Sequence, residues 1–231
     1  SVMHVNSETG VIQPIEEIGA APAGTPAYFH IGATQGFGKQ NDSLRRTQYN
    51  MLSITAHKLG GPQGVGAFVL KRGKDYRRPP LKPLMYGGPQ ERGYRPGTTP
   101  VALVAGFALA AELCDREEAA HWEACANIKA SFLRAIDGLD YSFNGAQEYC
   151  LPSTVNISFH GVDAEGIFLA LKDDYALSNG SACNSGSHEP SYVLSAMGLS
   201  EARIYEAVRL SWNYNTQVDF RPLVNYIQSI V

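Results

Sequence analysis

Four short apolar runs, each followed by a polar or glycine-rich loop, constrain the fold of this chain more than any other feature of its sequence. The runs cover residues 2–5, 27–31, 50–54 and 66–70. Short apolar runs bounded by such loops are typical of β-strands. Between the first two, Pro14 begins a predicted helix over residues 14–21, because proline suits the first helical turn and Glu16 and Glu17 suit the helix dipole there. Strand, helix and strand at this spacing predict an α/β fold with a mixed, mostly parallel sheet.

The loops that follow these strands carry polar side chains able to bind a ligand. In open α/β sheets, ligands bind at the carboxyl ends of the strands. We therefore expect one crevice that includes Asn6 and Ser7, residues 32–35 and residues 55–58.

The second half of the chain has a different rhythm. A long helical stretch begins at Pro100, and we predict a domain boundary within it, near Asp115. Beyond it, strands are predicted over residues 141–144, 155–159 and 208–212, and helices over residues 164–171 and 218–230. The sequence thus predicts one domain of residues 1–115 and a smaller α+β domain of residues 116–231.

Composition and charge narrow the classes of function. The net charge is −3 and the pI about 6.1, so no bulk attraction draws the chain to nucleic acid or to an anionic membrane. No run approaches the ~18 apolar residues of a membrane span. The six histidines show no HExxH-type spacing, so we predict no metal site.

Two further expectations concern the setting of the chain. The four cysteines show no CxxC or zinc-finger spacing, so we expect free thiols in a reducing, cytoplasmic compartment. The chain opens directly on a strand-like run, so we expect it to be part of a longer polypeptide.

Lys58 stands where the third apolar run meets a loop of five glycines and prolines. A partly desolvated lysine has a lowered pKa and can act as a Schiff-base nucleophile or a general base. The alternative is a solvated lysine on a surface loop, which is the commoner case for a single lysine. Both interpretations stay open on this stretch alone.

Cys183 lies within a loop of small polar residues, 177–190. Such a loop predicts an exposed and mobile thiol, whereas most free cysteines are buried and behave as small hydrophobic residues. Taken alone, this position favours a reactive cysteine and an inert one equally.

Four stretches in this order resemble the cysteine desulfurases, a group within the class V aminotransferase-like enzymes that use pyridoxal 5'-phosphate (PLP). They are MHVNSETG from Met3, TAHKLGGPQGVGA from Thr55, GGPQERGYRPGT from Gly87 and SNGSACNSGSHEPSYVL from Ser178. The resemblance covers essentially the whole chain and implies that the family's N-terminal third is absent from it. It also implies fold type I, with residues 1–115 as the C-terminal part of the PLP-binding large domain and residues 116–231 as a small domain that carries a mobile cysteine loop. It further implies a homodimer with active sites at the interface.

The resemblance implies roles for the residues of the cofactor site. Lys58 matches the lysine that binds PLP covalently, and His57 and Thr55 match contacts to its phosphate. Gln35 resembles the glutamine that hydrogen-bonds the phenolic oxygen of the cofactor. Thr98 resembles the threonine that reaches the phosphate bound to the neighbouring subunit.

The resemblance likewise implies the residues that handle the substrate. Arg209 resembles the arginine that holds the substrate carboxylate, for which a planar guanidinium is suited. Asn6 falls in the family's substrate-facing asparagine pattern, and Cys183 resembles the cysteine that becomes a persulfide.

Two positions depart from the family pattern. Ser7 stands where the family has a second asparagine, in Asn6-Ser7-Glu8. Gly32 stands where the family has an aspartate that pairs with the protonated pyridine nitrogen, and residues 33–35 fix the register of this comparison.

The implied reaction removes sulfur from L-cysteine. Lys58 would move the Cα proton, the Cys183 thiolate would take the sulfur as a persulfide, and alanine would be released. The sulfur would pass to an acceptor protein that serves iron–sulfur cluster assembly, tRNA thiolation or DNA phosphorothioation.

Two other functions stay open. A degenerate member with weak PLP chemistry would act as a sulfur-relay, scaffold or regulatory protein, and Ser7 and Gly32 favour it. A lyase for selenocysteine or cysteine sulfinate would tolerate an unimportant Cys183, but the full-length loop around this residue argues against it.

Overall fold

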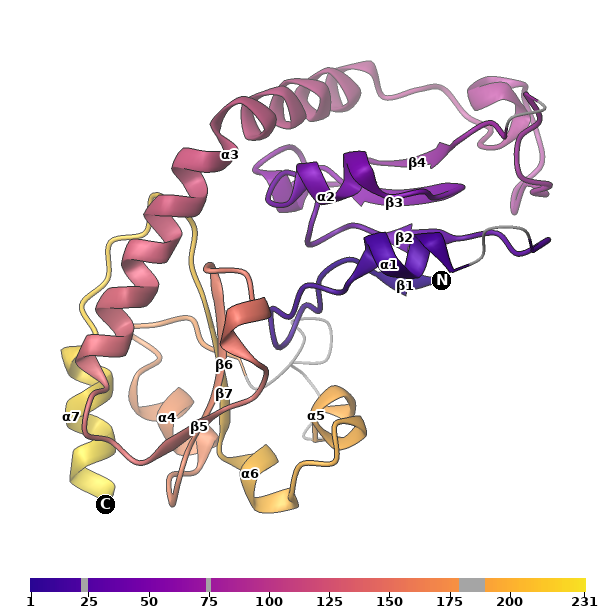
Figure 1. Ribbon diagram of the computed structural model, residues 1–231. Helices are drawn as coiled ribbons and strands as arrows, with labels where there is room; N and C mark the ends of the chain where they lie inside the picture. Colours follow the sequence, from indigo (N-terminus) through magenta and orange to yellow (C-terminus); the bar gives the residue numbers. More distant parts are fainter. Residues whose placement is uncertain (22–24, 74–75, 179–189) are drawn as a thin grey trace. The chain divides into compact units, whose positions relative to one another are not determined.

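The computed structural model describes residues 1–231 apart from 22–24, 74–75 and 179–189. The chain forms two compact units. The first unit consists of Ser1–His4 and Gln13–Glu118, and the second of Val5–Ile12 and Ala119–Val231. The long helix α3 (Val101–Ala135), labelled in Figure 1, contributes residues to both units.

The first unit is built on a four-stranded sheet of order β1-β2-β3-β4. Its elements are β1 (Val2–Met3), α1 (Ile15–Ala20), β2 (His30–Gly32), α2 (Asn41–Arg46), β3 (Met51–Thr55), the 3-10 helix η1 (His57–Leu59), β4 (Gly66–Leu70) and the 3-10 helix η2 (Gln90–Gly93). β1, β2 and β3 are parallel, whereas β4 pairs with β3 in the antiparallel sense. The predicted mixed, mostly parallel α/β sheet is confirmed.

One face of this sheet is covered by α1 and α2. Ile31 and Leu52 lie on that face and are buried against Ile15 of α1 and Leu44 of α2. These apolar contacts form the core of the first unit, and Figure 1 shows the two helices beside the strands.

Strand β2 begins later than the predicted run 27–31. The N–H of Phe29 donates to the side-chain oxygen of Asn50 at 2.7 Å instead of joining the regular ladder. The strand then continues to Gly32, which pairs with Ser53 of β3. The strand is therefore shifted toward the loop that carries the predicted ligand-binding residues.

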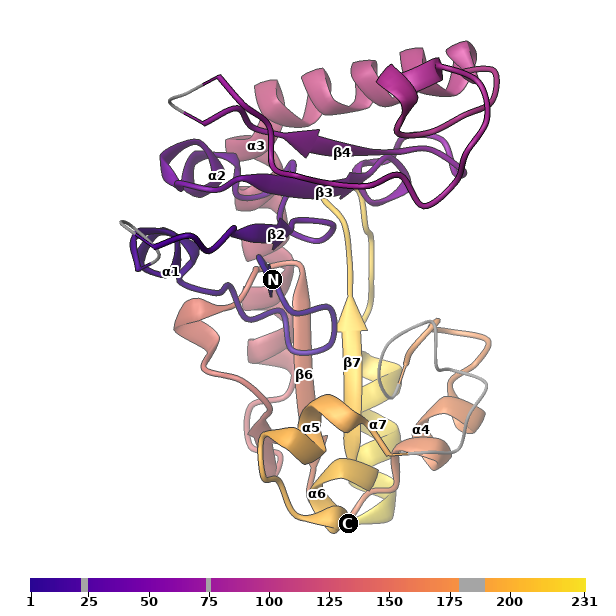
Figure 2. The same cartoon turned by 90° about the vertical axis from the view of Figure 1, so that its right-hand side faces the viewer.

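The second unit is an α+β layer. Its elements are β5 (Tyr141–Phe143), the 3-10 helix η3 (Gln147–Tyr149), β6 (Thr154–Phe159), α4 (Ala164–Ala170), α5 (Tyr192–Ala196), α6 (Glu201–Tyr205), β7 (Ala207–Ser211) and α7 (Arg221–Ile230). The strands form an antiparallel sheet of order β5-β6-β7, and Figure 2 shows β6 and β7 along their length. Phe132 of α3, Ile157 of β6, Val208 of β7 and Leu223 of α7 are buried in its core.

Across the described ranges, no helix is long and apolar enough to cross a membrane.

Candidate functional site

The residues that follow β3 form a tight turn, called here the Lys58 turn (residues 56–61). Ala56 is buried, and its carbonyl accepts hydrogen bonds from the N–H groups of Leu59 at 2.9 Å and Gly61 at 3.0 Å. Gly60 closes the turn with a φ of +79°, in the left-handed region that favours glycine. The glycine-rich stretch that follows the strand in the sequence thus forms a compact turn.

Lys58 is exposed at the surface of this turn. The interpretation as a partly desolvated lysine is therefore wrong for this chain, because Ala56 and, in part, Leu59 occupy the inward positions of the turn. The hydroxyl Oγ1 of Thr55 and the ring Nδ1 of the exposed His57 are hydrogen-bonded at 3.0 Å. An amine, a hydroxyl and an imidazole are thus gathered within four consecutive residues.

The residues that follow β2 form a second turn, called here the Gln35 turn (residues 33–40). The N–H of Ala33 donates to the carbonyl of Ser53 at 2.9 Å, so this turn begins on the β2–β3 ladder itself. The Ala33 carbonyl then accepts the N–H of Gly36 at 3.1 Å, which starts a helical turn, and Gln35 in it is half-buried.

The two turns lie at one edge of the sheet because β2 and β3 are parallel and end together. They touch directly: Gly38 packs so closely on Leu59 that a Cβ at Gly38 would lie 2.6 Å from Leu59 Cδ2. The structure thus brings together the predicted site residues Thr55, His57, Lys58 and Gln35, all of the first unit. Asn6 and Ser7 belong to the second unit, and the single crevice predicted from the sequence stays a prediction.

Gly32 ends β2 one residue before the Gln35 turn. A Cβ at this position would have as its nearest neighbours the Met3 Cα at 3.8 Å and the Val2 carbonyl oxygen at 4.0 Å. These are ordinary contacts, so the backbone has room for a side chain at Gly32. The glycine itself offers no carboxylate at this edge.

Thr98 lies in the exposed loop between η2 and α3. Nearby, the N–H of Gly97 donates to the side chain of Gln90 at 3.2 Å, and Thr99 Oγ1 donates to Glu91 at 3.5 Å. None of the described hydrogen bonds of this loop joins it to the Lys58 turn. The described hydrogen bonds therefore do not link Thr98 to the other predicted cofactor residues of its own chain, and its predicted phosphate contact stays a prediction.

In the second unit, the Asn6 side chain organises the loop in which it lies. Its Oδ1 accepts hydrogen bonds from the N–H groups of Glu8 and Thr9, each at 2.9 Å. An asparagine oxygen used in this way holds a local turn. The predicted substrate contact of Asn6 stays a prediction.

Arg209 of β7 is only partly exposed. Its Nη1 donates to the carbonyl of Ser7 at 3.1 Å, and its Nε is buried with no hydrogen-bond partner among the described residues. Burial lowers the pKa of Arg209, and the negative charge of Glu8 opposes that shift. A partly desolvated guanidinium with an unused N–H has the capacity to bind a carboxylate.

Cys183 and most of its loop lie outside the described residues, but the two ends of the segment are described. On one side, Ser178 forms a backbone bridge with Arg209. On the other, the Ser191 hydroxyl donates to the buried carboxylate of Glu8. Both ends are thus held by residues of the loop 6–8 and of β7.

Glu8 is a residue of this region that the sequence pattern does not single out. It stands in a polar turn where an exposed carboxylate is the ordinary expectation, yet only 2% of it is exposed. Its partner Ser191 precedes α5 as the N-cap and accepts the N–H of Leu194 at 3.2 Å. The pairing of Ser191 with Glu8 requires the tertiary structure.

Comparison with known proteins assigns the chain to a family. The profile of the class-V aminotransferases matches residues 1–222. The chain belongs to this family. Among its relatives, the mitochondrial cysteine desulfurase of Saccharomyces cerevisiae is 43% identical over 216 residues, which is 90% of this chain and 41% of the relative.

Solved structures agree with this assignment. DndA from Streptomyces lividans superposes with a TM-score of 0.79 at 41% identity, over 91% of this chain and 59% of that one. SspA, solved in complex with cysteine, superposes with a TM-score of 0.71 at 35% identity, over 90% of this chain and 57% of that one. This class-V aminotransferase-family chain thus spans about half the length of the relatives it matches.

Proposed function

We propose that this family member contributes to a cysteine desulfurase that uses PLP to move sulfur from L-cysteine to Cys183. The observation that carries the proposal is the contact between the Lys58 turn and the Gln35 turn at the carboxyl edge of parallel strands. The relatives named cysteine desulfurase and the neighbour solved with cysteine support the same reaction.

The residues at this edge fit most of the groups of PLP. The exposed amine of Lys58 suits the aldehyde of the cofactor, and the hydrogen-bonded pair Thr55 and His57 suits its phosphate. The half-buried Gln35 suits the phenolic oxygen. Gly32 is the exception, because it supplies no carboxylate to a protonated ring nitrogen.

The residues of this chain then have distinct tasks. When bound, PLP withdraws electrons from the Cα of the substrate amino acid. With PLP bound, Lys58 would hold the cofactor covalently, and its amine would move the Cα proton of the substrate. Arg209 binds the substrate carboxylate through its planar guanidinium.

Cys183 accepts the sulfur. Its thiolate attacks the substrate sulfur, so that an S–S bond forms as the Cβ–S bond breaks. The Cβ then takes up a proton and alanine leaves, while the protein retains a persulfide. A separate sulfur-acceptor protein removes this sulfur in the next step. The free thiols of Cys114 and Cys150 support a reducing cytoplasm as the setting.

We place the site at the interface of a homodimer. The segments before and after Thr98 in the sequence expose large apolar side chains: Leu84 is 97% exposed, Val101 73% and Leu109 57%. Large apolar side chains left exposed support an interface with another protein surface. A second copy on this region would meet the exposed Thr98, whose proposed partner is the phosphate bound in that copy.

One observation favours a second candidate, a scaffold or sulfur-relay protein with weak PLP chemistry. It is the absence of a carboxylate at Gly32, which leaves the ring nitrogen of the cofactor without its charged partner.

The decisive experiment joins cofactor capture with sulfur release. The protein incubated with PLP is expected to absorb visible light and, after borohydride reduction, to gain the cofactor's mass at Lys58. Lys58→Ala should lose this adduct, whereas Lys82→Ala, a change at another exposed lysine, should keep it. With L-cysteine and a thiol reductant, wild type should release sulfide, and Cys183→Ser should bind PLP without releasing sulfide.

Three results would contradict the proposal. A wild-type protein without an adduct at Lys58 would remove the enzyme from consideration. An adduct without sulfide release would favour the scaffold, and full sulfide release by Cys183→Ser would favour a lyase.

A further inference from the structure

One face of α3 contacts both turns of the proposed cofactor site. Four residues spaced four apart lie on this face, because positions i and i+4 are neighbours on a helix. They are Gly106, Ala110, Cys114 and Glu118, called here the α3 stripe. All four belong to the first unit.

The middle of the stripe holds the Lys58 turn. The Cys114 thiol donates to the carbonyl of Leu59 at 3.4 Å, and Leu59 directly follows Lys58. Gly61, at the end of the turn, packs on Ala110 so closely that a Cβ on Gly61 would lie 3.1 Å from the Ala110 Cβ. Small side chains on α3 therefore allow the turn to approach the helix.

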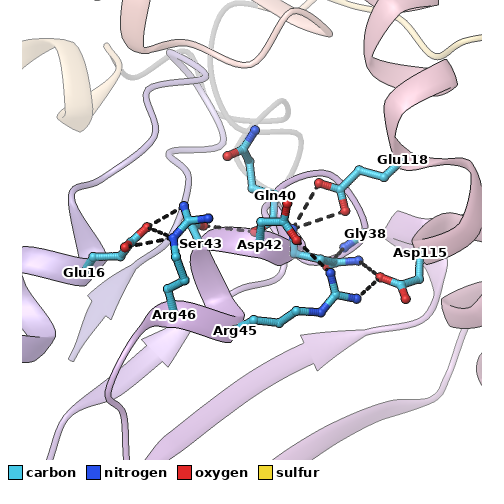
Figure 3. A network of polar contacts seen from close by, with 10 residues as sticks. Glu16, Gly38, Gln40, Asp42, Ser43, Arg45, Arg46, Asp115 and Glu118 are labelled. Atoms are coloured by element: carbon cyan, nitrogen blue, oxygen red, sulfur yellow. Dashed lines mark hydrogen bonds and ion pairs between the residues drawn. The ribbon is translucent and has the colours of Figure 1, made fainter.

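The end of the stripe holds the Gln35 turn. The backbone N–H of Asn41 donates to both carboxylate oxygens of Glu118, at 3.2 and 3.3 Å, and its side-chain amide donates to Asp115 at 2.9 Å. The Asn41 Oδ1 in turn accepts the N–H of Gly38 at 2.8 Å. Asn41 is only 5% exposed, and Figure 3 shows this network between α2 and α3.

The two turns and the stripe meet at one point. Gly38 has a φ of +79°, and a Cβ there would lie 2.6 Å from Leu59 Cδ2 and 3.1 Å from Cys114 Cβ. The Gly38 backbone, the Leu59 side chain and the Cys114 side chain thus pack against one another at this point. A shift of either turn against α3 would be passed to the other turn through Gly38 and Leu59.

We propose that the α3 stripe sets the spacing between the Lys58 turn and the Gln35 turn, with Cys114, Glu118 and Asn41 as positioning residues. The described contacts of the stripe with the two turns are made to Leu59, Gly61 and Gly38, and it acts through them. The proposal rests on the proposed function only in naming Lys58 and Gln35 as cofactor ligands.

The electrostatics of Glu118 agree with a carboxylate committed to this contact. Burial raises its pKa, the hydrogen bond from the Asn41 N–H opposes that shift, and Asp42 and Asp115 add to it. Arg45 forms ion pairs with Asp42 and Asp115 and offsets part of this negative charge. The Glu118 carboxylate is thus partly desolvated, and it accepts the backbone N–H of Asn41.

The test is amide hydrogen exchange of the full chain without cofactor. Both turns contain amides protected by backbone hydrogen bonds, such as Gln40 in one and Gly61 in the other. Glu118→Ala removes hydrogen bonds made to Asn41, which directly follows the Gln35 turn. Glu112→Ala, the same change at an exposed position of α3, is the matched control.

We expect Glu118→Ala to speed exchange about tenfold in both residues 36–40 and residues 57–61, because the turns move together. Cys114→Ala should speed exchange in both segments as well, and Cys114→Ser, which keeps a donor for Leu59, should restore protection. Glu112→Ala should match wild type. Faster exchange in residues 36–40 alone after Glu118→Ala, or in neither segment, would overturn the proposal.

A second readout is the affinity for PLP. Glu118→Ala should weaken it several-fold, although Glu118 makes no contact with residues 56–61. Unchanged affinity in a wild type that binds PLP would reject the positioning role. A wild type that does not bind PLP would refute the proposed function, while the exchange data would still decide whether the turns are coupled.

Discussion

Acidification should destabilise the first unit through His4, which follows β1. The side chain is fully buried. Its Nε2 lies 2.9 Å from the hydroxyl of Ser43, and that hydroxyl donates its own proton to the carbonyl of Gln40 at 2.9 Å. The Ser43 oxygen must therefore accept from Nε2–H, and the neutral imidazole carries its proton there. The other nitrogen, Nδ1, is buried with no hydrogen-bond partner among the described residues.

The sign of the effect follows from burial. Burial lowers the pKa of His4 from 6.5 to about 4, because the charged imidazolium would lose its hydration at this position. Above pH 6.5 the imidazole is neutral in the folded and the unfolded chain, so it adds no pH dependence. As the pH falls from 6.5 to about 4, the unfolded chain takes up a proton that the folded chain refuses, and stability is lost. The loss amounts to ~2 kcal/mol at pH 5 and ~3 kcal/mol below pH 4.

The assay is urea unfolding at pH 7.5 and pH 5.0 in wild type and His4→Gln. The glutamine amide can still donate to Ser43 but does not titrate, so the variant should lose ~2 kcal/mol less than wild type between the two pH values. His57→Gln, a change at an exposed histidine, is the control and should lose as much as wild type. An NMR titration of the His4 ring gives its folded pKa directly. Equal losses in wild type and His4→Gln would refute the reasoning.

Three further substitutions test other contacts. Gly36→Ala should destabilise the fold by about 2 kcal/mol or more in urea, because the added Cβ would lie 2.0 Å from His4 Nδ1; wild-type stability would contradict this packing. Ser191→Ala removes the cap of α5 and the donor to the buried Glu8 carboxylate, and should cost ~2 kcal/mol; an unchanged melting temperature would show that the pairing contributes nothing. Gly32→Asp should raise the rate of sulfide release at least about tenfold, since the position has room for a carboxylate; no gain would mean that another group serves the ring nitrogen.

The strands of this chain could be predicted from local pattern because each is an apolar run ended by residues that cannot continue it. The predicted run 66–70 matches β4, and the run 50–54 matches β3 to within one residue. Helix α2 could not be predicted in this way, because Asn41–Arg46 is polar and short. It is held by Asn41 and Arg45, which bond to Asp115, seventy or more residues further along the chain.

The solvation of Lys58 is a second feature that local pattern could not predict. Its place after an apolar strand suggested a partly buried amine, but which side chains of a turn face inward depends on the turn's own hydrogen bonds. In the structure the inward position belongs to Ala56, and Lys58 is exposed.

The sequence alone determined which chemical groups the chain carries and therefore its family. Lys58 in its glycine-rich stretch and Cys183 in its small polar loop are patterns of residue type and spacing, which need no coordinates to be recognised. The tertiary structure decided how such groups are held. Three features depend on residues far apart in the chain: the α3 stripe, the burial of His4 with its unpartnered Nδ1, and the pairing of Glu8 with Ser191. Packing between distant segments leaves no periodic pattern in either segment by itself.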